Sequence, residues 1–138
     1  MKKFKPLLFI SLTIILLSAC FPLISIAEKK GKAKIQFEET VYDFGIVKEN
    51  GGPVTHIFKF KNIGDGNLVI YSATAQCGCT KPSFSEEAIA PGKTGEIKVT
   101  YNPKGRPGGF RKDINVRSNG NPNKVTLRIT GTVAKEVK

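Results

Sequence analysis

Apolar and polar residues alternate along much of the chain, with a period of two. The alternation is clearest over residues 54–60, 96–101, 113–117 and 124–133. It is typical of β-strands that bury one face in a core and expose the other to water. Clusters of glycine, proline and asparagine separate these segments at a steady interval, as turns do. The pattern therefore predicts short strands joined by turns, without a helix.

Three segments depart from this alternation. Residues 68–73 are almost continuously apolar, which predicts a strand covered on both faces. Lys112 falls on the apolar phase of its strand, so either its aliphatic stem snorkels or the strand bulges there. Residues 35–47 supply one or two opening strands, with Tyr42–Gly45 as a kink between sheets.

The strand segments fill residues 34–134, a length that suits a single domain. About seven antiparallel strands joined by turns predict an all-β sandwich of two sheets. A small closed barrel has the same period and turn spacing, and it is the alternative architecture.

The first 27 residues have the form of an export signal, because three lysines precede an apolar run over residues 7–21. Two processing sites compete within this region. Leu17–Cys20 resembles the site at which a bacterial lipoprotein is cut and its cysteine lipidated, whereas Ser25–Ala27 has the small-x-small form of an ordinary cleavage site. An uncleaved anchor over residues 7–27 is a third interpretation. We therefore expect an exported protein, either periplasmic or lipid-anchored to the cell envelope.

This interpretation fixes the expected segments of the chain and the charge of its mature part. The segments are a signal peptide at 1–27 (or a lipoprotein signal at 1–19 with Cys20 lipidated), a linker at 28–33, the sandwich at 34–134 and a tail at 135–138. Cleavage after Ala27 removes three lysines and lowers the net charge from +11 to +8. The basic residues are scattered singly, so we expect a solvated surface or attraction to anionic envelope polymers and lipids, and no nucleic-acid binding.

Six short motifs occur in a recognisable order. They are Tyr42–Val47 (YDFGIV), Thr55–Gly64 (THIFKFKNIG), Leu68–Ile70 (LVI), Cys77–Thr80 (CGCT), Ile89–Ile97 (IAPGKTGEI) and Ile129–Val133 (ITGTV). Together they make the chain resemble, from about Ile35 to Val133, the bacterial family known as domain of unknown function 1573. The resemblance implies an immunoglobulin-like β-sandwich, similar to domains of the major sperm protein and Hydin type. Those are binding and scaffolding modules with no chemistry of their own.

Cys77 and Cys79 form the one pair of residues with reactive chemistry. Cysteines two apart can close a small disulfide ring, with Gly78 relieving the backbone strain, and an oxidising envelope favours that state. The main prediction is a structural disulfide of small stabilising effect. Thiol–disulfide exchange with a client and capture of Cu(I) or Zn(II) by two thiolates are the alternatives. Lys81, which is nearby, either lowers a thiol pKa or is simply solvated.

The remaining polar candidates favour ordinary structural roles. His56 falls in register with the apolar face of its strand, which predicts a half-buried strand residue. Glu86 and Glu87 are predicted to lie in a solvated loop. The glycine-rich stretch at 105–110 predicts a long hairpin connection, and the flanking Arg106 and Arg111 give a weak anion-binding hypothesis. No catalytic, cofactor-binding or metal-binding residue is predicted.

These observations favour an exported, non-enzymatic binding or scaffolding module of the bacterial cell envelope. We expect it to bind a protein or envelope partner through an exposed strand edge or a loop end. We expect contact with the membrane only through a lipid on Cys20 or an uncleaved anchor. The alternative function is thiol–disulfide exchange or copper binding through Cys77 and Cys79.

Overall fold

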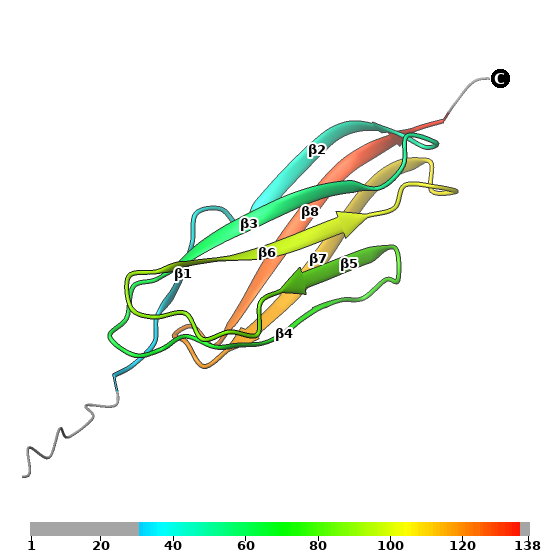
Figure 1. Cartoon of the computed structure of the whole chain (residues 1–138). Coiled ribbons are helices and arrows are strands. Elements are labelled where there is room, and N and C mark those ends of the chain that lie inside the picture. Colours follow the sequence, from blue (N-terminus) through cyan, green and yellow to red (C-terminus); the bar gives the residue numbers. More distant parts are fainter. Residues whose placement is uncertain (1–30, 136–138) are drawn as a thin grey trace, which may run out of the picture.

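The computed structural model describes residues 31–135, and these fold into two sheets packed face to face (Figure 1). The predicted signal segment, Cys20, the first half of the linker and the last three tail residues lie outside the described residues. The strands are β1 (Ile35–Phe37), β2 (Val41–Lys48), β3 (Val54–Asn62), β4 (Ile70–Ala75), β5 (Thr80–Phe84), β6 (Thr94–Tyr101), β7 (Gly108–Ser118) and β8 (Lys124–Ala134). No helix in this part of the chain is long and apolar enough to cross a membrane.

The strand order is β1-β3-β6-β5 in one sheet and β2-β8-β7-β4 in the other. The predicted sandwich is therefore confirmed, and the closed barrel is not formed. Two connections, β5–β6 and β7–β8, are hairpins within one sheet, whereas the chain crosses between sheets after β1, β2, β3, β4 and β6. The expected hairpin at 105–110 is wrong, because β6 and β7 belong to different sheets.

The opening segment forms two strands that belong to different sheets. β1 pairs antiparallel with β3, and β2 pairs parallel with β8, so the prediction that every strand is antiparallel is wrong for β2. The switch occurs just after Phe37: Glu38 N–H still donates to Lys59 O, but Thr40 O already accepts from Arg128 N–H. It therefore precedes the predicted kink at Tyr42–Gly45. Gly45 instead has a φ of 65°, at a bulge in β2 between Asp43 and Ile46.

The alternating apolar positions fill the space between the two sheets, as predicted. Phe58, Ile97, Val99, Ile114 and Leu127 are among the fully buried side chains. Tyr101 from β6 stacks on Phe110 from β7, with ring centroids 4.0 Å apart, and so joins the two sheets. Burial raises the pKa of Tyr101, and the positive charge of Arg106 opposes the rise. This aromatic contact lies close to the end of the sandwich at which β6 stops and β7 starts.

Two local predictions have different outcomes. Residues 68–73 do not form a strand covered on both faces, because β4 is an edge strand and Tyr71 is 64% exposed. A register shift between Ile70 and Ser72 disturbs the alternation there. Lys112 is half-buried in a stretch of β7 whose pairing with β8 is regular, so its stem snorkels and the strand does not bulge.

Candidate functional site

Cys77 and Cys79 lie in the turn that carries the chain from β4 in one sheet to β5 in the other. Their sulfur atoms lie side by side, and their Cα atoms are 5.2 Å apart. Cys79 is buried, and its carbonyl oxygen accepts a hydrogen bond from Asn102 N–H at 2.9 Å. Thr80 N–H donates to the Cys77 carbonyl at 3.1 Å, which closes the turn. The turn is thus fixed to the β6–β7 connection, and the disulfide itself stays a prediction.

His56 does not join the cysteine pair. His56 donates to or accepts from Glu39, with 2.6 Å between Nε2 and Oε1, and its ring stacks on Tyr42 at a centroid distance of 3.5 Å. It is half-buried, as predicted, and it links β3 to β2 of the opposite sheet. Within residues 31–135 no group of three or more histidine, cysteine or carboxylate side chains is placed to hold a metal ion.

The remaining candidate residues lie in different environments. Glu86 and Glu87 are exposed in the loop before β6, as predicted. Lys81 is exposed on β5. The Nη1 group of Arg106 donates to the carbonyl of Lys104 at 2.7 Å, so this guanidinium folds onto its own loop. Arg111 is exposed on β7, and it lines a surface depression together with Cys77.

A hollow of about 530 Å³ lies on the outer side of the β2-β8-β7-β4 sheet, where β7 begins and β2 ends. Its lining residues are Asp43, Gly45, Ile46, Gly109, Phe110, Arg111, Thr130, Gly131 and Thr132. Three of them are glycines, so backbone rather than side chains forms much of the floor. Ile46 stands at the rim and is 79% exposed, the highest value among the large exposed apolar side chains of the described residues.

The missing side chains of two glycines in this hollow have different structural effects. A Cβ on Gly131 would meet two ring carbons of Phe110 at 2.7 Å, so the lack of a side chain lets that ring pack. A Cβ on Gly109 would meet no atom closer than 4.0 Å, so its lack of a side chain leaves open space. Sequence analysis missed the site because Gly131 falls on a core phase, and because the bulge at Gly45 moves Ile46 out of the phase of β2. Glycine within a strand was the available signal.

A second depression, of about 370 Å³, lies between the start of β7 and the segment that follows β4. It is lined by Ala75, Gln76, Cys77, Arg111, Lys112 and Asp113. Arg111 borders both depressions, so they form one continuous surface. We call the residues that line the two depressions the distal face.

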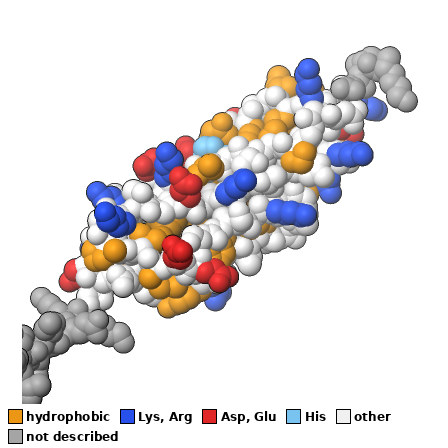
Figure 2. All heavy atoms as spheres, viewed as in Figure 1, with side chains coloured by type: hydrophobic (Ala, Val, Ile, Leu, Met, Phe, Trp, Pro, Cys, Tyr) orange, Lys and Arg blue, Asp and Glu red, His pale blue; other side chains and the backbone are white. Residues whose placement is uncertain are grey.

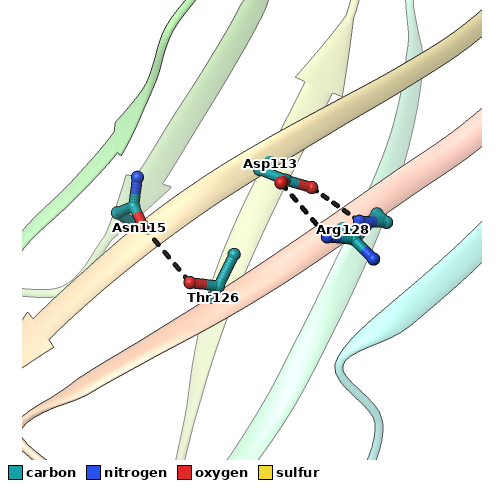
Figure 3. Close-up of polar contacts among 4 residues, drawn as sticks. All are labelled: Asp113, Asn115, Thr126 and Arg128. Atoms are coloured by element: carbon teal, nitrogen blue, oxygen red, sulfur yellow. Dashed lines mark hydrogen bonds and ion pairs between the residues drawn. The ribbon is translucent and has the colours of Figure 1, made fainter.

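An ion pair sets the charge of Asp113, one of the two acidic residues in this surface; the other is Asp43. Arg128 Nε donates to Asp113 Oδ1 at 2.6 Å, and Nη2 donates to Oδ2 at 3.2 Å (Figure 3). The Arg128 hydrogen bonds, with the nearby charges of Arg128 and Arg111, hold the pKa of Asp113 below its usual value. Asp113 is therefore ionised and paired at neutral pH, which leaves Arg111 and Lys112 to set the sign of the charge in the second depression.

The end of the sandwich that carries the distal face is basic. Segments 46–54, 76–81, 101–112 and 132–135 meet there, and they contain Lys48, Lys81, Lys104, Arg106, Arg111, Lys112 and Lys135 against one carboxylate, Glu49. Figure 2 shows basic side chains at this upper-right end, and most acidic ones toward the end where the described chain begins. The distal face thus combines an exposed aliphatic residue with open backbone, and it lies at the basic end of the sandwich.

Comparison with known proteins agrees with this architecture. A family model described as protein of unknown function (DUF1573) matches residues 35–133. The chain belongs to this family. No curated protein matches the chain.

Solved structures share the fold at low sequence identity. A protein of unknown function from Porphyromonas gingivalis W83 is 15% identical, with a TM-score of 0.64 over 74% of this chain and 47% of that one. The PapD-like domain 7 of human CEP192 is 10% identical, with a TM-score of 0.62 over 88% and 99%. The VesB protease of Vibrio cholerae is 16% identical, with a TM-score of 0.60 over 72% and 32%. The chain spans less than half of the two bacterial proteins, and these similarities show the immunoglobulin-like, PapD-like fold alone.

Proposed function

We propose that the chain is an exported, non-enzymatic immunoglobulin-like module of the bacterial cell envelope that binds a protein partner on its distal face. The observation that carries this proposal is Ile46, 79% exposed at the rim of a hollow floored by Gly109 and Gly131. An exposed aliphatic side chain beside open backbone gives a partner both apolar area and main-chain groups to contact.

Two further features support export and presentation of this face. The sequence carries the form of an export signal before residue 28, with Cys20 or Ala27 at the processing site. The described chain begins at the end of the sandwich opposite the distal face, as its blue start in Figure 1 shows. Attachment through the N-terminal segment therefore leaves the distal face as the part farthest from the point of attachment.

A photo-crosslinking amino acid in place of Ile46 tests the proposal in the full chain, expressed in its own host. The matched control places the same probe at Ile63, which is 48% exposed and lies at the opposite end of the sandwich. We expect one discrete adduct from position 46 and none from position 63. Gly109→Val should reduce the adduct about tenfold, because it fills the hollow that the partner contacts.

Three results would overturn parts of this proposal. Equal adducts from positions 46 and 63, or none from either, would remove the distal face as a binding site. Loss of the adduct in a Cys77→Ser, Cys79→Ser variant that still folds would favour the thiol-based alternative. An intact mass that begins at Met1 in the cytosolic fraction, rather than at Cys20 with acyl chains or at Glu28, would overturn export.

A further inference from the structure

We propose that the segment received by the distal face is an extended, acidic stretch of the partner protein, which adds a strand to the free edge of β7. This inference rests on the proposed function, because it names the partner chemistry of the same surface. Three observations support it: a stretch of β7 is unpaired, the four outer sheet edges are less suited to strand addition, and the surroundings of Arg111 are basic.

The first half of β7 lacks a neighbour on one side. β4 pairs with β7 only between Ile114 and Ser118, although β7 begins at Gly108. Beyond Ala75 the chain turns away toward Cys77 and the other sheet. No other strand of the described residues pairs with β7 on that side. The stretch from Gly108 to Asp113 is therefore an edge within an otherwise paired strand.

The backbone groups of this edge point outward at alternate residues. Ser118 N–H donates to Asn123 O, so Ser118 and the residues two and four before it direct their N–H and C=O groups toward β8. Asn119 N–H donates to Val69 O, on the opposite side. By the same alternation Gly109, Arg111 and Asp113 direct their N–H and C=O groups away from β8. These are the groups that an added strand needs.

The four outer edges of the two sheets are each less suited to strand addition. β1 has three residues, and β5 contains Pro82, which has no N–H to donate. β4 is irregular between Ile70 and Ser72. β2 bulges at Gly45, whose N–H donates to the Asp43 carboxylate at 2.9 Å. The stretch at the start of β7 has a regular register with β8 and none of these features.

The charge beside this edge selects an acidic segment. Arg111 and Lys112 are consecutive, so their side chains leave β7 on opposite sides, and both line the depression next to Cys77. Asp113 is paired with Arg128 and does not cancel them. Carboxylates on an added strand would form charge-assisted hydrogen bonds with these two cations, and the basic end would speed the encounter.

Binding of two eight-residue peptides to the processed full chain tests this inference. One peptide alternates valine and glutamate, and the other alternates valine and lysine; both carry a fluorophore for anisotropy. We expect the glutamate peptide to bind at least about tenfold more tightly than the lysine peptide, with an affinity that falls as salt rises. Arg111→Glu should weaken it about tenfold.

The matched control is Arg117→Glu, which makes the same charge change on the same strand and the same side. Arg117 is exposed but lies where β4 already covers the edge, at the position that pairs with Ser72. We expect this variant to bind the glutamate peptide as the unaltered chain does. Equal loss in both variants would mean that only net charge matters, and would overturn a site at Arg111.

Hydrogen exchange separates strand addition from simple charge attraction. Bound glutamate peptide should slow exchange at the amides of Gly109, Arg111 and Asp113, and leave Phe110 and Lys112 unchanged because they already face β8. Binding without this alternating protection would overturn strand addition, as would binding to phosphatidylglycerol vesicles in place of peptide. If neither peptide binds but the Ile46 adduct persists, this inference fails and the proposed function stands; loss of the Ile46 adduct removes both.

Discussion

The two ends of the sandwich are built in different ways. At the end where the described chain begins, the fully buried Asn62 side chain joins several loops: its Nδ2 group donates to Gly66 O at 2.8 Å and to Ile89 O at 2.9 Å, and its Oδ1 accepts from Gly64 N–H at 3.0 Å. At the distal end, backbone hydrogen bonds close the turns, such as Arg106 N–H to Pro103 O at 3.1 Å, and join the turn at Cys79 to Asn102. One end is joined by a shared buried side chain, and the other mainly by backbone hydrogen bonds.

The glycines follow the same division. Gly64 and Gly66 lie against the backbone of Lys32 and Gly31, so a side chain at either position would collide with main-chain atoms. Gly105 and Gly109 have open space where a side chain would project. Close approach of one backbone segment to another at a glycine is therefore found at the end where the described chain begins.

The largest expected effect that would test this contrast comes from Asn62→Ala. The change removes the hydrogen bonds from Asn62 to the carbonyls of Gly66 and Ile89 and to the N–H groups of Gly64 and Lys34, and we expect a loss of about 2–4 kcal/mol in the free energy of unfolding. The matched control is Asn102→Ala at the distal end, where the exposed Asn102 side chain accepts only the N–H of Lys104, at 3.1 Å. That loss should be about 0.5–1 kcal/mol. Urea denaturation measures both, and equal losses would contradict the contrast.

An intermediate effect is expected from two alanine substitutions within the hollow itself. Gly131→Ala places a Cβ against the Phe110 ring and 3.0 Å from Gly45 O, and should cost about 1–3 kcal/mol by overpacking. Gly109→Ala meets open space, with a φ outside the left-handed region, and should be neutral or slightly stabilising. Thermal unfolding of the two variants measures the difference. Adding Phe110→Leu should recover part of the Gly131→Ala loss; no recovery would contradict the steric explanation.

Periodicity predicted the sandwich because buried strands impose a period of two on residues such as Ile97 and Val99. It allowed one or two opening strands but placed the change of sheet at Tyr42–Gly45, since the position of the switch between β1 and β2 depends on which partner strand is nearby, and the sequence does not encode that locally. It misplaced residues 68–73 because an apolar run looks alike on a covered strand and on a bulged edge. The hollow was missed because it depends on the side chain that is absent at Gly109 and on the bulge that moves Ile46 to the rim.

The same limit applied to the chemistry. The spacing of Cys77 and Cys79 drew attention to the turn, but spacing does not reveal which neighbours a turn meets. The structure adds Arg111 and Lys112, which come from β7 more than thirty residues later in the chain. Conversely, Arg106 and Arg111 lie close in sequence, yet one is held by its own loop and the other faces the depressions. A surface site that is assembled from separate strands can be predicted only when the order of the strands in the sheet is known.

The smallest expected effect concerns Asp113, the last residue of the unpaired stretch of β7, and Arg128, which lies opposite it on β8. Because the folded pKa of Asp113 is lowered by its hydrogen bond to Arg128, the pair stabilises the fold above the ordinary value of 3.8, and this contribution is lost as the pH falls through the lowered value. Asp113→Asn should therefore unfold at a lower temperature than the unaltered chain at pH 7, and the two melting temperatures should converge as the medium is acidified below about pH 4.

Thr126→Val is the matched control for this pH dependence. Thr126 donates to Asn115 at 3.2 Å, one cross-strand position along the same two strands, and neither group titrates (Figure 3). Its effect on the melting temperature should be the same at pH 7 and in acid. A gap between Asp113→Asn and the unaltered chain that persists in acid would mean that packing, rather than charge, accounts for the pair. Added salt should also narrow the gap at pH 7, because the two side chains are partly exposed, and solvent and ions screen such pairs.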